Sequence, residues 1–494
     1  MSRTVEWALV VVAVIGALPY VVAVIQLLIV GGHRYRSHLD RSAPYFPRTA
    51  ILVPAWNEAP VLRDTIERLV ALEYPIDRLR IVVVDDASTD DTPAVLAAMI
   101  ERYPDTVVHL RREHGGQGKA HTLNHGLAHV LADDWAEAVL IMDADVVFTP
   151  PSLRRLTRHL ADPEVGAVTG YIKEGSGDKN GIRLTIAFEY TVAQAIARRA
   201  QNVGGALACL AGGAQLHSRA NLEAIGGAID TSTLAEDTVT TFLTQLGGRK
   251  VVFDPNAVVW AEEPDTVDGV WKQRLRWARG NVQVTRRFHR VFFRPSPTHR
   301  LGGLLFGLWW YTLMALPILM ITSSAALVGL WAMESSLEKD AFRWLWIANG
   351  LSFLFLLVFT WLVDPEIGWR AWLRGIMFPG LVSALIIVGS VFPPVNDGLR
   401  DTFSDVTGVS ITDGIERAVA LAAYLWVSLC MVAAYLVWRV DRAGHHRLAG
   451  ALLWIVGYGP LQCAITFTGF VKEARHAELV WDKTVKSGGV AARS

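Results

Sequence analysis

The sequence predicts a soluble α/β domain inserted between membrane-spanning helices, and two observations support this fold class. Apolar residues make up 52% of the 494-residue chain and charged residues only 19%, which is too apolar for an ordinary soluble protein. The apolar excess is concentrated in residues 5–30 and in several runs after Leu301, whereas residues 47–298 read as an ordinary soluble domain. That domain, of roughly 250 residues, is large enough to bury its own core.

The long apolar runs are candidate membrane spans, because a spanning helix needs about 20 apolar residues. Basic residues beside a span resist translocation and mark the cytosolic side. They flank the soluble region at Arg34 and Arg36 and again between Arg286 and Arg300, which predicts a cytosolic domain held at the plasma membrane. The predicted spans are residues 5–30, 301–331, 342–363, 373–392 and 418–438.

A sixth apolar run, residues 448–470, carries Gly457, Gly459 and Pro460 at its centre, where they would interrupt a straight helix. We interpret it as a re-entrant or in-plane segment that leaves the C-terminus in the cytosol; an ordinary sixth span is the alternative. The predicted domains are an N-terminal transmembrane helix (1–32), a soluble domain (45–300), transmembrane and interfacial helices (301–470) and a cytosolic tail (471–494).

Charge and cysteine content exclude some functions. The 47 basic and 47 acidic side chains cancel, so net charge gives no support for a nucleic-acid partner. Three scattered cysteines, Cys209, Cys430 and Cys463, have neither the spacing of a metal site nor the number expected of a disulfide framework. Eighteen tryptophans are typical of a protein anchored at membrane interfaces.

Within the soluble region, short apolar runs rich in β-branched residues alternate with turns and helical patterns. This alternation predicts a parallel sheet with helices on both faces, and ligands of such sheets gather at the carboxyl ends of the strands. Polar clusters follow three of the runs, at residues 54–58, 85–90 and 143–145, so we expect them to converge on one sheet edge. The predicted strands are residues 49–53, 80–85, 107–110 and 138–142.

Crowded carboxylates repel one another and need a cation or hydrogen-bonding ligand. Asp143 and Asp145 are separated by one residue, so both can reach a hard divalent cation that also binds phosphate. An isolated pair of this kind is usually a turn. Here the apolar residues 139–142 place it at a strand end, which favours a functional site.

The ordered set of motifs resembles the GT-A domain of family 2 glycosyltransferases. The resemblance spans the whole soluble domain, and its later motifs are similar to those of membrane-embedded synthases of cellulose, chitin, hyaluronan and poly-N-acetylglucosamine. The last of these is the most similar between residues 259 and 277, with cellulose-type synthases close behind. The motifs are VPAWNE (53–58), VDDASTD (84–90), GKAHTLN (118–124), DAD (143–145), GGA (212–214), AED (235–237) and QRLRW (273–277).

The resemblance implies a UDP-sugar donor, UDP-GlcNAc or UDP-glucose, and a Mg²⁺ or Mn²⁺ ion held by Asp143 and Asp145. Asp237, with Glu236 beside it at the start of a helix, is the expected general base; the alternative is a helix-terminal charge favoured by the dipole. Trp277 and Gly213 are expected to contact the acceptor. The expected donor-binding residues are Pro54, Asn57, Glu58, Asp85, Asp86, Lys119, Asp143, Gln273 and Arg276.

One carboxylate base and no evident nucleophile predict direct displacement with inversion, giving a β-linked product from an α-linked donor. Near the end of the chain, Trp481, Lys483 and Thr484 are similar to a Trp-x-Lys-Thr element of such synthases. We expect this segment to close over the donor pocket and exclude water; a disordered tail is the alternative.

Three functions remain open at this point. The first is a processive synthase that extends a polysaccharide and exports it through the membrane, with export or accessory subunits as partners. The second is a transferase that adds one sugar to a lipid acceptor and yields a glycolipid. The third, a donor-binding or transport protein without catalysis, would be expected to lack the base or the metal pair.

Overall fold

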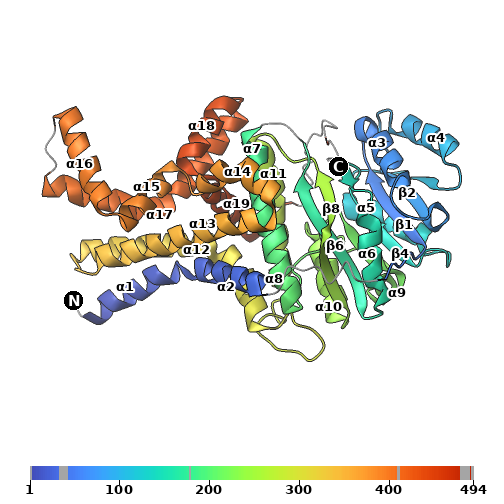
Figure 1. The fold of residues 1–494 in the computed structure, drawn as a ribbon, viewed down its shortest axis with the longest axis horizontal. Coiled ribbons are helices and arrows are strands. Elements are labelled where there is room, and N and C mark those ends of the chain that lie inside the picture. Colours follow the sequence, from blue (N-terminus) through green and yellow to red (C-terminus); the bar gives the residue numbers. More distant parts are fainter. Residues whose placement is uncertain (1–2, 33–42, 177–179, 409–411, 479–489, 491–494) are drawn as a thin grey trace. The chain divides into compact units, whose positions relative to one another are not determined.

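The computed structural model describes residues 3–32, 43–176, 180–408, 412–478 and 490, and the chain forms two compact units (Figure 1). We call them the sheet unit and the helical unit. The sheet unit comprises Ile29–Pro264, Arg279–Gly307 and Ala477–Ser494. The helical unit comprises Met1–Leu28, Asp265–Ala278 and Leu308–His476.

The sheet unit is built on an eight-stranded sheet in the order β3-β2-β1-β4-β7-β6-β8-β5. The strands β3, β2, β1 and β4 are parallel, and they lie where the sequence predicted strands. The strands are β1 Thr49–Ala55, β2 Leu79–Asp85, β3 Val107–Arg111, β4 Ala138–Ile141, β5 Val146–Phe148, β6 Val165–Glu174, β7 Gln215–Ser218 and β8 Lys250–Ala261.

The predicted parallel arrangement holds for these four strands, but the other half of the sheet, which was not predicted, is mixed. Strand β7 runs antiparallel to both β4 and β6, and β5 runs antiparallel to β8. Apolar runs indicate where strands lie, whereas strand direction depends on the connections between them.

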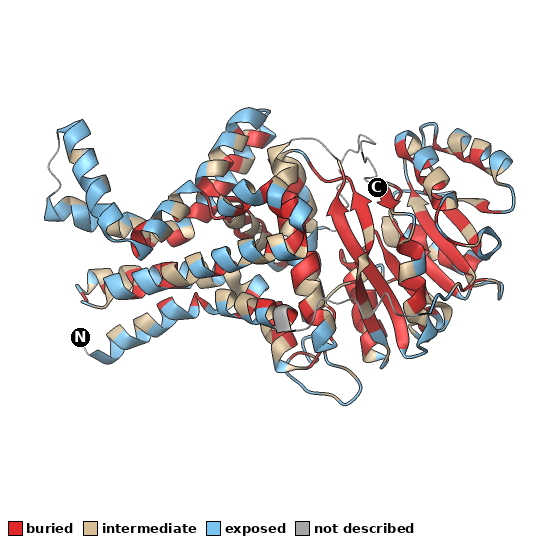
Figure 2. Cartoon of the chain, viewed as in Figure 1, coloured by how far each residue is buried: buried red, intermediate tan, exposed pale blue. Residues whose placement is uncertain are grey.

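Helices cover the sheet and bury apolar stripes against it. Helix α5 packs Leu123 and Leu127 against Leu52 of β1 and Val84 of β2, all four fully buried. Strands β1, β2 and β6 are almost entirely buried (Figure 2). The helices of this region are α3 Ala59–Val70, α4 Thr92–Arg102, α5 Lys119–Val130, α6 Ser152–Thr157, α7 Gly181–Tyr190, α8 Ala197–Gly204, α9 Arg219–Ala224 and α10 Glu236–Leu246.

The helical unit contains three helices that are long and apolar enough to cross a membrane: α12 Leu304–Ala332, α13 Glu338–Val363 and α17 Asp413–Arg442. Three bent pairs raise the number of candidate spans in the described chain to six. They are α1 Arg3–Ile15 with α2 Leu18–Gly32, bent by 43°; α14 Pro365–Ile376 with α15 Leu381–Val391, by 83°; and α18 His446–Val456 with α19 Tyr458–Ala474, by 101°. Two further helices are α11 Val267–Arg287 and α16 Pro394–Thr407.

The expected interruption of residues 448–470 is confirmed, because α18 ends at Val456 and the chain turns at Gly457, whose φ is +101°. Residues 5–30 and 373–392, predicted as single helices, are instead broken. The second break lies at Gly380, whose φ of +87° is a conformation that glycine adopts readily. A single glycine beside a proline was too small a signal to predict an 83° bend.

Candidate active site

The loops that follow β1 and β2 are tied together by hydrogen bonds. The Asn57 amide donates to Ser88 Oγ at 2.9 Å, and the Thr89 amide donates to Asn57 Oδ1 at 2.8 Å. Asn57 and Ala87 both have left-handed backbones, with φ of 54° and 56°. Such a conformation costs about 1 kcal/mol or more for a residue with a Cβ, and strain of this kind clusters at functional sites.

Asp85 and Asp86 are buried carboxylates with partners inside the protein. Asp85 Oδ1 accepts from the Ser88 amide and Oδ2 accepts from Arg111, each at 2.8 Å. Asp86 pairs with Arg112. Asp85 is completely buried with both oxygens occupied, so in this structure its carboxylate supports the loop. Neither arginine was predicted to contact these carboxylates, although their position at the end of β3 was the available signal.

Two other predicted donor-binding residues lie in or beside the loop that follows β1. Pro54 lies within β1, and Glu58 is the residue immediately before α3. The Glu58 amide donates to Thr92 Oγ1 at 2.9 Å. Gly213 lies next to the metal-ligand candidate, since a Cβ on it would stand 3.7 Å from Asp143 Oδ2 and 3.0 Å from Val146.

A buried lysine lies among the acidic residues at the sheet edge. Lys119, the first residue of α5, has its Nζ 2.5 Å from Asp143 Oδ1 and 3.1 Å from the Gly212 carbonyl oxygen. Burial lowers the pKa of Lys119, but the negative charges of Asp143, Glu236 and Asp237 outweigh burial and raise it. The lysine is therefore a permanent positive charge at neutral pH, surrounded by three carboxylates.

Asp237 stands at the start of α10, as predicted, with Glu236 buried beside it. Asp237 Oδ1 accepts from the Thr238 amide at 2.7 Å. Gly212 lies close to both Asp237 and Lys119. A Cβ on Gly212 would lie 3.3 Å from Asp237 Oδ2 and 3.5 Å from Lys119 Nζ. Asp237, Lys119 and Asp143 are therefore joined in one continuous cluster.

Cys209 belongs to the same cluster and was not predicted there. Burial raises the pKa of the Cys209 thiol, and the negative charge of Asp237 raises it further. The thiol donates to the Leu210 carbonyl oxygen at 2.9 Å and stays protonated at neutral pH.

The residues Asp143 and Asp145 fit the requirements of a divalent cation. Both are partly exposed beyond the end of β4, and Asp143 pairs with the Lys119 ammonium, which a cation bound to the same oxygen would displace. No group of three His, Cys, Asp or Glu side chains in the described chain forms a ready-made metal site. A cation here would therefore complete its coordination with water and with phosphate oxygens, which are ligands that Mg²⁺ and Mn²⁺ accept.

Gln273, Arg276 and Trp277 lie on α11, within the segment that belongs to the helical unit. That segment is anchored by Trp271, which stacks on Trp438 with ring centroids 4.3 Å apart. The Arg274 guanidinium lies 4.0 Å from the Trp277 ring centroid, a cation–π contact that was not predicted. The predicted gating residues Trp481, Lys483 and Thr484 lie outside the described residues.

Comparison with known proteins agrees with this geometry. The family model described as "Glycosyltransferase like family 2" matches residues 47–280. The probable glycosyltransferase YdaM of Bacillus subtilis (strain 168) is 31% identical over 304 residues, which cover 60% of this chain and 71% of that protein. The chain belongs to glycosyltransferase family 2. This membrane glycosyltransferase is thus an enzyme of the hexosyltransferase type, as the sequence predicted.

Two other similarities bear on this glycosyltransferase. The poly-beta-1,6-N-acetyl-D-glucosamine synthase of Staphylococcus aureus (strain COL) is 29% identical over 252 residues, covering 50% of this chain and 57% of the synthase. A mannosyltransferase from Pyrobaculum calidifontis, solved in complex with GDP-Man and Mn²⁺, matches with a TM-score of 0.53 and 26% identity. That match covers 79% of this chain and 99% of the mannosyltransferase, and it confirms the predicted GT-A fold.

Proposed function

We propose that this family 2 glycosyltransferase is an inverting synthase that extends a β-linked polysaccharide from a UDP-sugar. The observation that carries the proposal is the cluster of Lys119, Asp143 and Asp237, which joins a cation site to a base. UDP-GlcNAc is the first donor to test, because a poly-N-acetylglucosamine synthase is among the relatives. The catalytic domain faces the cytosol at the plasma membrane, where nucleotide sugars are available.

The diphosphate of the donor binds at the carboxyl end of β4. Asp143 and Asp145 would hold Mg²⁺ or Mn²⁺ there, and that ion supplies Lewis-acid neutralisation of the leaving nucleotide. The Mn²⁺ in the similar mannosyltransferase supports this assignment. Lys119 adds a second, permanent positive charge at the same point, because its pKa is raised. The loop of Asn57 and Glu58, braced by Asp85 and Asp86, forms the uracil end of the pocket.

Asp237 acts as general base on the acceptor. Its carboxylate takes the proton of the acceptor hydroxyl as that oxygen attacks the anomeric carbon and the bond to the diphosphate breaks. A single displacement inverts the configuration at that carbon. The glycine at position 212 favours this reaction, because a residue without a Cβ leaves space for the acceptor beside Asp237 and Lys119.

The family resemblance also assigns roles to residues of α11. Gln273 and Arg276 would bind the departing diphosphate through charge-assisted hydrogen bonds, and Trp277 would stack on the acceptor sugar. Trp277 is 36% exposed, so its ring is available for such a contact. Trp481, Lys483 and Thr484 would close over the bound donor.

A second function is supported by one specific observation. A mannosyltransferase solved with GDP-Man matches this chain in structure over 79% of its length. A transferase that uses GDP-mannose, or that adds one sugar to a lipid, is therefore the alternative.

A donor screen tests both functions. Purified enzyme in detergent with membrane lipids is incubated with radiolabelled UDP-GlcNAc, UDP-glucose or GDP-mannose, with Mg²⁺ or Mn²⁺ and with EDTA as control. Labelled product of high molecular weight from a UDP-sugar supports the synthase. A single labelled lipid, or turnover of GDP-mannose alone, supports the alternative. Equal turnover in EDTA would contradict the metal assignment.

A further inference from the structure

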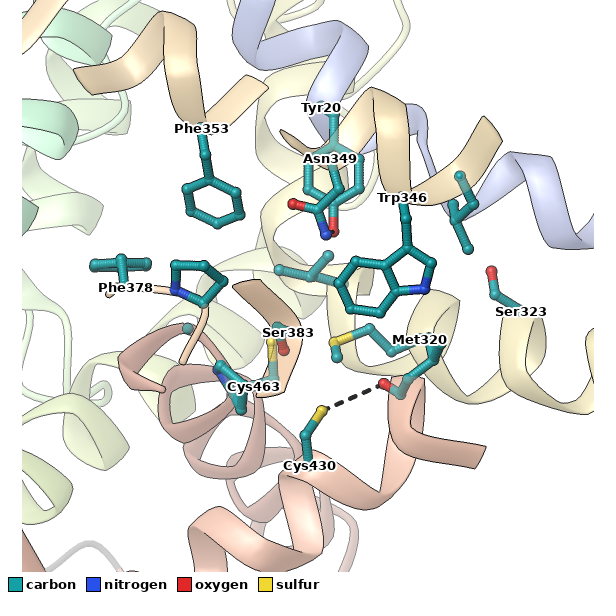
Figure 3. Close-up of a pocket in the computed structure, with 17 residues that line it drawn as sticks. Tyr20, Met320, Ser323, Trp346, Asn349, Phe353, Phe378, Ser383, Cys430 and Cys463 are labelled. Carbon is teal, nitrogen blue, oxygen red and sulfur yellow. Dashed lines mark hydrogen bonds between the residues drawn. The ribbon is translucent and has the colours of Figure 1, made fainter. Parts of the chain in front are cut away.

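Two buried features were not predicted from the sequence. The first is a cavity of about 140 Å³ in the helical unit, lined mainly by apolar side chains such as Phe353 and Phe378 (Figure 3). The polar Ser323 in its wall already donates to the Ala13 carbonyl oxygen at 3.0 Å. An apolar lining of this kind gives little specificity, so it selects no particular ligand. The second feature is a loop of the sheet unit, and its polar contacts bear directly on the candidate active site.

The 206–212 loop lies between α8 and β7 and leads to the candidate base. Leu207 and Leu210 of this loop are fully buried. A buried backbone outside helices and strands needs other hydrogen-bond partners, because unpaired N–H and C=O groups are costly. At the end of the loop, the Gly212 carbonyl oxygen accepts from Lys119 Nζ at 3.1 Å, and Gly212 lies beside Asp237. The path of the loop therefore determines what stands next to the candidate base.

One face of α10 holds the loop in place. Asp237, Thr241 and Gln245 are spaced by four residues, so they lie along the same face of the helix. The Leu207 amide donates to Gln245 Oε1 at 3.0 Å, and Gln245 Nε2 donates back to the Leu207 carbonyl oxygen at 2.8 Å. The Leu210 amide donates to Thr241 Oγ1 at 2.8 Å. The helix that carries the candidate base therefore also holds the loop beside that base.

A second set of contacts holds the other end of the loop. The Ala211 amide donates to Thr169 Oγ1 at 3.0 Å, and that hydroxyl donates to the Ala214 carbonyl oxygen at 2.8 Å. Thr169 and Gln245 are both buried, so water does not readily replace them as partners. Because a buried backbone group without a partner is costly, the loop cannot slide along α10 without losing these bonds. Its position therefore depends on a few side chains.

We propose that Gln245 is a positioning residue for the transfer reaction: its paired hydrogen bonds to Leu207 fix the 206–212 loop, so that Gly212 stands at a set distance from Asp237. This role rests on the proposed function, in which Asp237 deprotonates the acceptor beside Gly212. The eight residues from Asp237 to Gln245 span about 12 Å of helix, so Gln245 acts through the loop and not on the substrate. A misplacement of about 1 Å at the reacting groups can slow catalysis about 100-fold.

Gln245→Met tests this role, because it keeps the length of the side chain and removes both hydrogen bonds to Leu207. The purified full chain is assayed for kcat and donor KM with its best nucleotide sugar. We expect kcat to fall about tenfold, with a smaller change in donor KM, because the loop lies beside the base. Tyr74→Phe is the matched control. It removes a buried hydroxyl that donates to the Pro47 carbonyl oxygen at 2.5 Å, before the start of β1, and should lower Tm without lowering kcat.

Gln245→Glu separates positioning from a simple loss of stability. A protonated glutamate can donate to and accept from Leu207 as glutamine does, whereas an ionised glutamate can only accept. Burial favours the protonated form, so lowering the pH from 8 to 6 should restore both hydrogen bonds. We expect the kcat of Gln245→Glu, divided by the wild-type kcat at the same pH, to rise about threefold or more over this range.

The results have distinct meanings. Wild-type kcat in folded Gln245→Met, a loss of kcat no greater than that in Tyr74→Phe, or a constant ratio for Gln245→Glu between pH 8 and pH 6 would overturn the role of Gln245. Asp237→Asn, assayed in parallel, separates this role from the proposed function. Lost turnover in Asp237→Asn with wild-type turnover in Gln245→Met overturns only the positioning role, whereas wild-type turnover in Asp237→Asn overturns both.

Discussion

The ammonium of Lys119 lies 2.5 Å from the carboxylate of Asp143, although 24 positions separate the two in the sequence. Lys119 begins α5, and Asp143 follows β4, so the fold of the sheet unit brings them together. Lys119 was predicted to bind the nucleotide-sugar donor, and Asp143 was predicted to bind the metal ion. The chain therefore carries an ammonium group, paired with acidic side chains, beside the predicted metal site.

Removing that charge should impair catalysis. Lys119→Met keeps most of the side-chain volume but removes the ammonium, and we expect kcat/KM to fall about 10²–10³-fold, a typical loss for a preorganised electrostatic contact. Lys119→Arg, which keeps the charge, should retain more activity than Lys119→Met. Steady-state kinetics of nucleotide release measure both. Wild-type kinetics in Lys119→Met would mean that the lysine has only a structural role.

Gly212 should not tolerate a methyl group. Gly212→Ala would place a Cβ 3.3 Å from Asp237 Oδ2 and 3.5 Å from Lys119 Nζ, in the space left for the acceptor. We expect kcat to fall about tenfold, because small displacements of reacting groups slow catalysis strongly. Gly398→Ala is the matched control, since a Cβ there meets open space. Equal activity of the two variants would argue against an acceptor beside Gly212.

The sheet unit should lose stability in acid through Asp254. This fully buried carboxylate accepts from Arg158 at 2.8 Å and contacts His159 Nε2 at 2.9 Å. Burial alone would raise the pKa of Asp254. These two partners lower this pKa by more than burial raises it, so the net shift is downward. A lowered pKa stabilises the fold above the unfolded value, near 3.9, and this contribution disappears as pH falls through the folded value.

Asp254→Asn should therefore reduce the free energy of unfolding by about 3 kcal/mol at neutral pH and flatten its decline below pH 4. The exposed Asp105→Asn serves as the control. Thermal unfolding between pH 3 and pH 8 measures both effects. An unchanged pH profile in Asp254→Asn would contradict the assignment.

The backbone contact between the break at Gly380 and the break at Gly457 should be essential for the thermal stability of the helical unit. Gly457→Ala combines a φ of +101° with a Cβ only 2.4 Å from the Pro379 backbone, so the helices must separate. The control Gly450→Ala lies within α18, the helix that ends just before Gly457, where a Cβ has no neighbour within 4 Å. We expect a clear fall in Tm for the first variant and little change for the second. Equal Tm values would show that the breaks do not depend on this contact.

Local patterns predicted much of this protein because they report on single elements. The β-branched runs located β1 to β4, and the acidic start of α10 placed Glu236 and Asp237 at its first turn. Contacts between distant positions were not predictable in this way. Arg111 reaches Asp85 across 26 positions, and the local sequence does not give the pairing of these two side chains. The bend at Gly380 was missed because it depends on a tight contact with Gly457.

Asp237→Asn tests the central claim most directly, because it removes the base while keeping the shape of the side chain. The measurement is kcat and donor KM for the purified enzyme with its best sugar nucleotide, after confirming that the variant folds. The mechanism predicts that kcat falls by at least about 10²-fold, the usual contribution of a general base, while donor KM changes little. Turnover at the wild-type rate would contradict it.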